Sequence, residues 1–451
     1  MNSDLTSAPI PELVRRLAIP AGTGFFFNTM FNVVDTWYGG RLSTTALAAM
    51  SLCFPVFFII LAIGSGVSSG ATTMIGNALG RKQPSEAQSY VLQSLSFALL
   101  HALLLTAAGL AAAPAIFTLM GARGDYLAQS LNYMNVIFIG CPFFLLNFVM
   151  NAIHNAHGNT RAYRNFLISG FVLNLILDPW FMYGGLGLPP FGLAGVALST
   201  ILIQCLGNFY LFSQLSKTSV ITTFRLKELL PRREQFRELF KQGFPSAMNM
   251  MTVSIGIFVI TWYVGRFGEQ AVAAYGIGTR IEQIALLPIM GLNISTLALT
   301  AQNFGAGRID RIRETLRVSL RYGFVIALAG TLAALLFRAE LMRVFSSDSK
   351  VVAIGSGFLS IEAFVFPAYV LLYISISAMQ GIKLPGFGLL IGLYRQIAGP
   401  LLVFHLLSVV LGLGLAGVWW GILAVTWSAA LIVVVYVSAT LAKLEKEQIN
   451  V

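Results

Sequence analysis

Two aspartates stand inside long apolar stretches, where a charge without a partner is costly. Asp35 lies in NTMFNVVDTWYGG and Asp178 lies in LNLILDPW. A carboxylate at the centre of a membrane helix costs about 2.5–3.5 kcal/mol on insertion scales, so we expect each one to have a function and a partner. Asn174 precedes Asp178 by one helical turn, which places both on one face. Because Pro179 lacks the N–H that would bond the Leu175 carbonyl, the pattern predicts an oxygen-rich site for a proton or sodium ion.

The helices that position these residues must cross a membrane. Of the 451 residues, 57% are hydrophobic and only 10% are charged, against roughly 25% charged residues in a soluble domain. This composition excludes a water-soluble fold. Splitting the apolar runs at charges and at Gly/Pro/Asn clusters predicts an all-α integral membrane protein. The twelve predicted transmembrane helices lie near 14–39, 46–76, 88–112, 126–152, 163–184, 191–214, 240–264, 272–301, 315–337, 351–380, 386–411 and 415–440.

The basic residues orient the chain. Placing both termini in the cytoplasm puts 21 of the 29 lysines and arginines on the cytoplasmic side, as the positive-inside rule requires. The net charge of +11 is then explained by topology, and we expect no nucleic-acid partner.

The second half of the sequence repeats the first at a constant offset. This offset pairs Thr36-Trp37-Tyr38 with Thr261-Trp262-Tyr263, Pro20 with Pro245, and Gly66 with Gly291. Such a constant offset indicates duplication. We therefore predict an N-terminal six-helix lobe over 1–214, a cytoplasmic linker over 215–239, a C-terminal six-helix lobe over 240–440 and a cytoplasmic tail over 441–451. Parallel repeats of this kind place the substrate path between or within the two bundles.

The carboxylates are not duplicated with the scaffold. The repeat pairs Asp35 with Ile260, and a slightly shorter local offset, set by Pro179 and Pro400, pairs Asn174 with Arg395 and Asp178 with Gly399. Their restriction to the first half favours ion coupling there, although Asp35 could also cap its helix or pair with Arg41. A second polar set, Glu362 with the neighbours Arg280 and Glu282, is expected to be structural or conformational.

No enzymatic motif accompanies these sites. The sequence contains no GxxxxGK[ST] phosphate loop, no HExxH and no GxSxG, so we expect a protein that is not an enzyme. Transport is then passive or driven by an ion gradient. Polar residues that could line a cavity in the first half are Asn28, Tyr133, Asn147, Asn151 and Thr200.

The whole chain resembles the MATE family of multidrug and toxic compound extruders. The resemblance rests on the two six-helix halves, on VDTWYGGRLSTTALAA with its echo in the seventh helix, and on the NxxxDP pattern of the fifth. Carboxylates in the first half, with no acidic residue on the seventh helix, are similar to the DinF-like bacterial branch. The NorM-like branch places acidic residues in the second half, where this sequence offers Glu362 on the tenth helix.

The resemblance implies an antiporter with V-shaped lobes and alternating access. It would export cationic or amphipathic drugs in exchange for H⁺ or Na⁺, with no cofactor besides the coupling ion, as a monomer among the lipids of the bacterial inner membrane. Matching positions imply cation coupling at Asp35, Asn174 and Asp178, with Thr200 or its neighbour Ser199 completing a sodium shell. They also imply a bend of the first helix at Pro20 and a substrate cavity at Asn28, Tyr133, Asn147 and Asn151.

The two carboxylates suggest how the exchange would work. In a low-dielectric cavity both cannot ionise cheaply, so a substrate cation and a coupling ion would compete for one negative charge. A flippase for a lipid-linked substrate is the alternative. It would need several cationic residues to hold a pyrophosphate, and Arg280 and Arg395 are too few.

Overall fold

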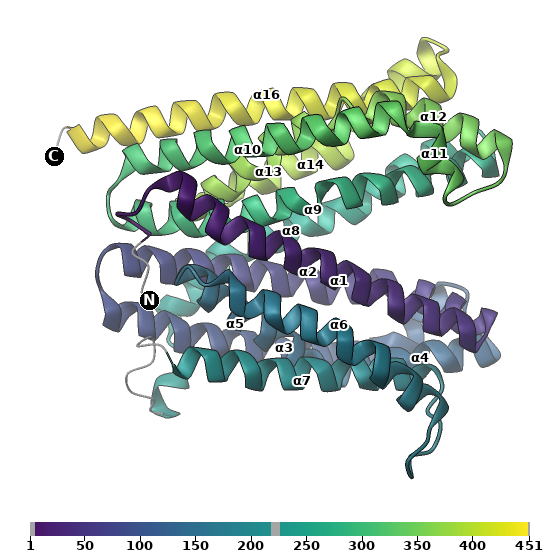
Figure 1. Cartoon of the computed structure of the whole chain (residues 1–451), viewed down its shortest axis with the longest axis horizontal. Helices are drawn as coiled ribbons and strands as arrows, with labels where there is room; N and C mark the ends of the chain where they lie inside the picture. The colour runs from purple at the N-terminus through teal and green to yellow at the C-terminus, as the bar shows by residue number, and fades with distance from the viewer. Residues whose placement is uncertain (1–4, 218–225, 450–451) are drawn as a thin grey trace. The chain divides into compact units, whose positions relative to one another are not determined.

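The computed structural model describes residues 5–217 and 226–449. Within these ranges the regular elements are helices, apart from an isolated bridge between Gly185 and Leu188 (Figure 1). Residues 1–4 of the predicted first lobe, 218–225 of the linker and 450–451 of the tail lie outside the described ranges.

The helices agree with the predicted membrane spans. They are α1 (Ile10–Leu42), α2 (Thr44–Gly80), α3 (Pro84–Leu119), α4 (Gly124–Ile139), α5 (Cys141–Ala156), α6 (Thr160–Tyr183), α7 (Leu193–Ser216), η1 (Leu226–Leu229), α8 (Arg233–Gly265), α9 (Glu269–Gly305), α10 (Ile309–Leu336), α11 (Arg338–Arg343), α12 (Ser349–Glu362), α13 (Phe366–Gly381), α14 (Gly386–Leu393), η2 (Tyr394–Ala398), α15 (Gly399–Phe404), η3 (His405–Val410) and α16 (Gly414–Ile449). Two pairs, α4 with α5 and α12 with α13, are bent by 48° and 53°. Counting each bent pair as one span, the described residues give the twelve predicted spans.

The chain forms two compact units whose boundaries lie inside helices. Of the described residues, unit 1 holds those between Thr23 and Ala247, and unit 2 combines residues 5–22 with residues 248–449. The first part of α1 therefore belongs to unit 2 and the first part of α8 to unit 1. The sequence places the division between the halves in the linker, because composition changes there, whereas packing divides the chain at equivalent positions of the repeat within α1 and α8.

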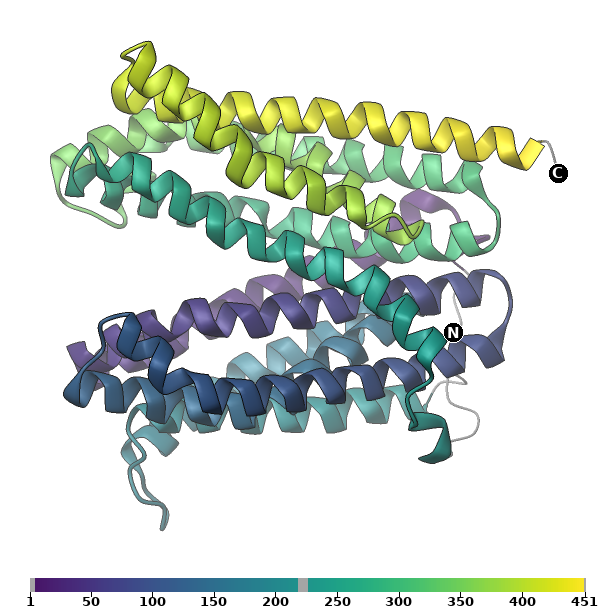
Figure 2. The ribbon, with the colours of Figure 1, turned by 180° about the vertical axis from the view of Figure 1, so that it is seen from behind.

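Each unit has its own apolar core. In unit 1, α2 packs against α3, α4 and α5, and α6 packs against α7; the length of α3 runs beside α2 in Figure 1. In unit 2, α9 packs against α10, α12 and α13, and α16 packs against α13. Figure 2 shows α8 along its whole length, including the first part that belongs to unit 1.

Side chains bind the backbone ahead of α8 and α1 in equivalent ways. In unit 1 the buried Gln93 donates to the carbonyls of Glu228 (2.7 Å) and Leu230 (2.9 Å). In unit 2 the buried Arg311 donates to the carbonyls of Leu5 (3.3 Å) and Ala8 (2.6 Å). The offset that pairs Pro20 with Pro245 also pairs Leu5 with Leu230, so the acceptor is repeated, whereas Gln93 and Arg311 do not occupy paired positions.

Two glycines allow close helix crossings beside the unit boundaries. A Cβ on Gly66 of α2 would lie 2.6 Å from the Gly243 carbonyl oxygen of α8. A Cβ on Gly291 of α9 would lie 2.3 Å from the Ala18 carbonyl oxygen of α1. Both partners in the second contact are related to those in the first by the offset of the repeat. The repeat therefore preserves a backbone contact near Pro20 and its counterpart Pro245.

We expect Gly291→Ala to lower the thermal stability of the purified protein. The added methyl group would overlap the α1 backbone, and overpacking of this kind costs about 1–3 kcal/mol. The matched control is Gly276→Ala in the same helix, where a Cβ would meet no described atom within 4 Å. That control should keep or raise the midpoint, because alanine favours a helix over glycine by up to about 1 kcal/mol. Equal midpoints for the two variants, measured by thermal unfolding in detergent, would contradict the close crossing.

Candidate functional site

Asp35 is held in unit 1 by residues from two other helices. The α1 carboxylate is 7% exposed. Its Oδ1 accepts a hydrogen bond from Asn174 Nδ2 on α6 at 2.8 Å. Its Oδ2 lies 3.4 Å from Thr200 Oγ1 on α7, whose single proton can go to this oxygen or to the Val196 carbonyl at 3.0 Å. The structure thus brings together three residues that are far apart in the sequence and that the sequence assigned to one site.

Asp178 completes the cluster from α6. It is fully buried, and its Oδ1 accepts a hydrogen bond from Ser199 of α7. Asp178 and Asp35 lie within electrostatic range of each other. Among the described residues, no donor reaches Asp178 Oδ2 or the amide oxygen of Asn174. The cluster therefore presents buried oxygen atoms that no described protein group satisfies.

The two α7 hydroxyl groups divide between the carboxylates. The sequence offered Ser199 and Thr200 as alternatives for one role, whereas in the structure Ser199 bonds Asp178 and Thr200 faces Asp35. Adjacent helical residues point about 100° apart, so one helix can supply a donor to each of two neighbouring groups. Their adjacency alone could not show which hydroxyl meets which carboxylate.

Tyr38 is a neighbour of the site that the sequence did not assign. Its hydroxyl donates to the Leu175 carbonyl at 3.2 Å, which is the carbonyl that Pro179 leaves without a helix partner. In unit 2 its counterpart Tyr263 donates to the Leu401 carbonyl, also at 3.2 Å. The repeated Thr-Trp-Tyr triplet was the signal that could have identified this bond.

Arg41 is not the partner of Asp35 here. Its guanidinium lies over the ring of Trp37, 5.1 Å from the ring centroid. Among the described residues, neither Asp35 nor Asp178 forms an ion pair. Hydroxyl and amide groups thus supply the hydrogen bonds to both carboxylates.

The predicted cavity residues do not form one group. Tyr133 on α4 is half-buried and within electrostatic range of Asp35 and Asp178. Asn147 is buried, and its amide donates to the backbone and side-chain oxygens of Gln204 at 2.8 and 2.6 Å. Asn28 is exposed on α1, and Asn151 is half-buried on α5.

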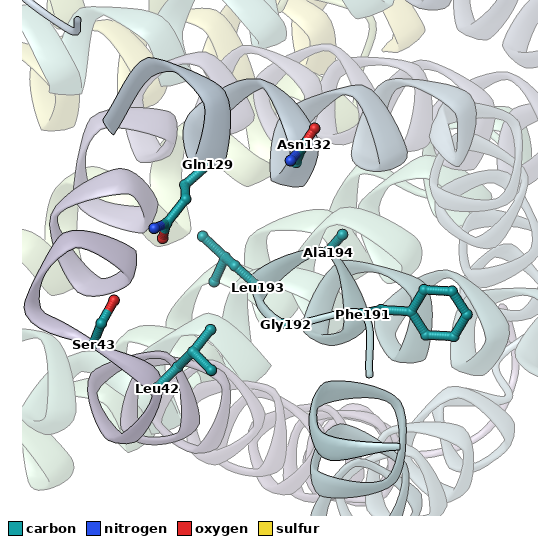
Figure 3. Close-up of a pocket in the computed structure, with 8 residues that line it drawn as sticks. All are labelled: Leu42, Ser43, Gln129, Asn132, Phe191, Gly192, Leu193 and Ala194. Carbon is teal, nitrogen blue, oxygen red and sulfur yellow. The ribbon is translucent and has the colours of Figure 1, made fainter. Parts of the chain in front are cut away.

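A pocket of about 320 Å³ lies elsewhere in unit 1, near the end of α1 (Figure 3). Its lining comes from the α1–α2 corner, from α4 and from the start of α7. The residues are Leu42, Ser43, Gln129, Asn132, Phe191, Gly192, Leu193 and Ala194. None of the predicted cavity residues lines it, so sequence reasoning did not identify this pocket.

The arrangement can exchange one positive charge. Burial makes the ionised form of each carboxylate costly, and two neighbouring carboxylates repel each other. A proton shared between them removes one negative charge, and the bare oxygens of Asp178 and Asn174 are ligands that suit a proton or a hard monovalent cation. This chemistry fits the predicted sodium set of Asp35, Asn174, Asp178 and Thr200, with Ser199 added.

Comparison with known proteins gives the same duplication. The MatE family model matches residues 20–180 and again 245–404. These two segments begin at Pro20 and Pro245, which are also paired by the internal repeat.

Similar proteins span most of the chain. The FAD transporter of Shewanella oneidensis is 28% identical over 87% of each chain. The multidrug export protein MepA of Staphylococcus aureus is 26% identical over 78% of each. An outward-facing structure of a multidrug resistance MATE family transporter of the MOP superfamily covers 99% of both chains with a TM-score of 0.91 and 24% identity, which confirms the twelve-helix fold.

We expect Asn174 and Asp35 to be energetically coupled. In a double-mutant cycle of Asn174→Ala and Asp35→Ala, the stability losses of the two single variants should together exceed the loss of the double variant by about 1 kcal/mol or more. Either single substitution already removes the hydrogen bond between the two side chains, which involves a charged group, so the double variant cannot lose that bond again. Asn147→Ala serves as the control with Asp35→Ala, since Asn147 bonds Gln204 instead. Additive effects for both pairs would rule out the Asn174–Asp35 bond.

Proposed function

Because this chain belongs to the MatE family, and is therefore a multi-pass membrane transporter, we propose that it exports cationic or amphipathic drugs by antiport with protons or sodium ions. The observation that carries the proposal is the pair of buried carboxylates, Asp35 and Asp178, which have polar partners but no ion pair among the described residues. Carboxylates inside a membrane protein mark ion pathways and proton relays, so we assign this pair to ion coupling.

The two carboxylates would let substrate and coupling ion compete. A drug cation gains affinity from their negative charge while the site lacks a coupling ion. While Asp35 and Asp178 share one proton they keep one negative charge, and arrival of the coupling proton neutralises that charge, so the drug cation loses its attraction and leaves. The competition requires only that the drug cation and the coupling ion do not bind at the same time.

The same residues could hold a sodium ion. Asp35 and Asp178 would supply carboxylate oxygens, Asn174 its amide oxygen, and Ser199 and Thr200 hydroxyl oxygens. Hard oxygen ligands of this kind suit an alkali cation, and Asp178 Oδ2 and the Asn174 amide oxygen receive no hydrogen bond from the described residues. The coupling ion is the one that neutralises the charge of Asp35 and Asp178 at the pH and sodium concentration in which the protein functions.

Neutralising Asp35 would act on a helix shared by the two units. Residues Thr23–Leu42 of α1 belong to unit 1 with Asp35, whereas the part before Thr23 belongs to unit 2. Pro20 lies in this continuous helix and leaves the Arg16 carbonyl without its helix partner. We place the bend of alternating access there. The working unit is a monomer in the bacterial inner membrane, with both termini in the cytoplasm.

We expect Asp35→Asn and Asp178→Asn to abolish gradient-driven export of a fluorescent cation. Ethidium transport in everted vesicles should fall to the level of vesicles without the protein, because neither variant can exchange the charge. Imposing pH and sodium gradients separately identifies the ion. Glu86→Gln, which removes a surface ion pair with Arg81, is the matched control and should transport normally. Full export by both aspartate variants would place coupling elsewhere.

A second candidate is export of a flavin dinucleotide, favoured by the similarity to the FAD transporter over 87% of each chain. An anionic dinucleotide would be repelled by ionised Asp35 and Asp178, so we rank it below drug export. We expect cells that overproduce the protein to release ethidium and to leave extracellular FAD unchanged. Increased flavin fluorescence in the medium, without ethidium export, would reverse the ranking. Export of neither would favour a flippase for a lipid-linked substrate.

A further inference from the structure

The end of α1 carries a group of aromatic and basic side chains that take no part in the proposed transport. Trp37 and Tyr38 make an edge-to-face contact, with ring centroids 4.8 Å apart. The Arg41 guanidinium lies over the Trp37 ring, 5.1 Å from its centroid. Because the Tyr38 hydroxyl donates to the Leu175 carbonyl on α6 at 3.2 Å, the group is tied to a neighbouring helix of unit 1.

The end of α8 carries the same group in unit 2. Trp262 and Tyr263 make an edge-to-face contact at 4.9 Å, and the Arg266 guanidinium lies 3.9 Å from the Trp262 ring centroid. The Tyr263 hydroxyl donates to the Leu401 carbonyl on α15 at 3.2 Å. The offset of the repeat pairs each tryptophan, tyrosine and arginine of one group with the same residue type in the other. The two aromatic–arginine clusters are thus Trp37, Tyr38 and Arg41 in unit 1 and Trp262, Tyr263 and Arg266 in unit 2.

Packing within each unit explains only part of the two clusters. The tyrosine hydroxyl bonds are enough to tie each helix end to its neighbour. The tryptophans face outward instead, with Trp37 54% exposed and Trp262 50% exposed. Both arginines are exposed as well. A purely structural role therefore accounts for the tyrosines but leaves the exposed tryptophan–arginine pairs unexplained in both units.

The charges of the two arginines are available to an anion. Among residues 5–217 and 226–449, neither Arg41 nor Arg266 forms an ion pair. Stacking on an indole uses the face of the guanidinium and leaves the N–H groups at its edge free. Those N–H groups form a fork that can bind two oxygens of one phosphate. Because the stacked guanidinium is already held in place, less side-chain freedom is lost when the phosphate binds.

Both clusters lie where a membrane span ends. α1 ends at Leu42 and α8 ends at Gly265, so each arginine is within one residue of the end of its helix. Tryptophan is enriched at the membrane–water interface, at the level of the lipid headgroups. A tryptophan followed by an arginine one turn later therefore presents an apolar ring to the acyl chains and a cation to the headgroup phosphates.

We propose that the two aromatic–arginine clusters bind the phosphate groups of membrane phospholipids, one lipid at the end of α1 and one at the end of α8. The ligand is a phosphodiester carried by a diacyl lipid, because each cluster joins a free guanidinium edge to an exposed apolar ring. The bound lipids would hold the ends of the two helices that are divided between the units. This role is separate from export and is the same for any substrate or coupling ion.

The test is lipid-dependent thermal stability of the full chain in detergent. Phosphatidylglycerol is titrated in parallel with a diglucosyl lipid that has the same acyl chains and no phosphate. We expect the unfolding midpoint to rise more with the phospholipid, because a ligand of the folded state stabilises it. Arg41→Gln and Arg266→Gln should each remove about half of that difference, and together nearly all of it, since the two sites are equivalent. Arg123→Gln is the matched control and should keep the difference, because Arg123 donates to the carbonyls of Thr118 and Ala122 at 3.1 and 3.2 Å.

Equal phospholipid responses in the parent and in the variant carrying both glutamines would overturn the proposal. An equal rise with inorganic phosphate at matched ionic strength would overturn the assignment to a lipid. If the variant with both glutamines does not fold, Arg41→Lys combined with Arg266→Lys takes its place. Lysine keeps the charge without the planar fork, so this variant should need about tenfold more phosphatidylglycerol for the same gain. An unchanged requirement would refute the stacked arginine site, whatever the ethidium assay shows for Asp35.

Discussion

Burying Asp35 and Asp178 together is the constraint on which the functional half of this protein depends. Each carboxylate receives neutral hydrogen-bond donors, Asn174 and Thr200 for the first and Ser199 for the second. Neutral donors stabilise a negative charge without cancelling it, whereas a lysine or arginine in direct contact would cancel it permanently. The charge that remains is what an ion gradient and a cationic substrate could both act on. The helices α1, α6 and α7 must therefore hold these side chains close while leaving some oxygens bare.

One helix, α1, connects that pair to the other unit of the duplicated scaffold. α1 carries Asp35 in its second part, and its first part is bound into unit 2 through the carbonyls of Leu5 and Ala8. The close contact of Ala18 with Gly291 fixes the same part by backbone packing. A change at Asp35 thus acts on an element that both units hold. α8 also belongs to both units, but in the opposite order, because its first part belongs to unit 1 and the rest to unit 2.

The sequence predicted the helices and the carboxylate cluster well, because both follow from strong local costs. Long apolar runs can only be spans, and an aspartate within them needs a partner such as Asn174. The sequence could not predict that the first part of α1 belongs to unit 2 and the first part of α8 to unit 1. The apolar pattern of α1 shows which residues are buried but not which unit buries them. Asn147 illustrates the same limit: its polar character suggested a cavity, whereas the structure pairs it with Gln204. Long-range partners among polar residues require the packed geometry.

The two candidate substrates make opposite electrostatic demands on the two halves. A drug cation is attracted by the uncancelled charge of Asp35 and Asp178 in unit 1. An anionic dinucleotide would instead need a cation such as Arg395 in unit 2, whose guanidinium lies over the ring of Tyr369. Binding the cation removes repulsion between buried carboxylates, whereas binding the anion would leave those carboxylates unbalanced. The unequal distribution of charge over an otherwise repeated scaffold therefore favours a cationic substrate.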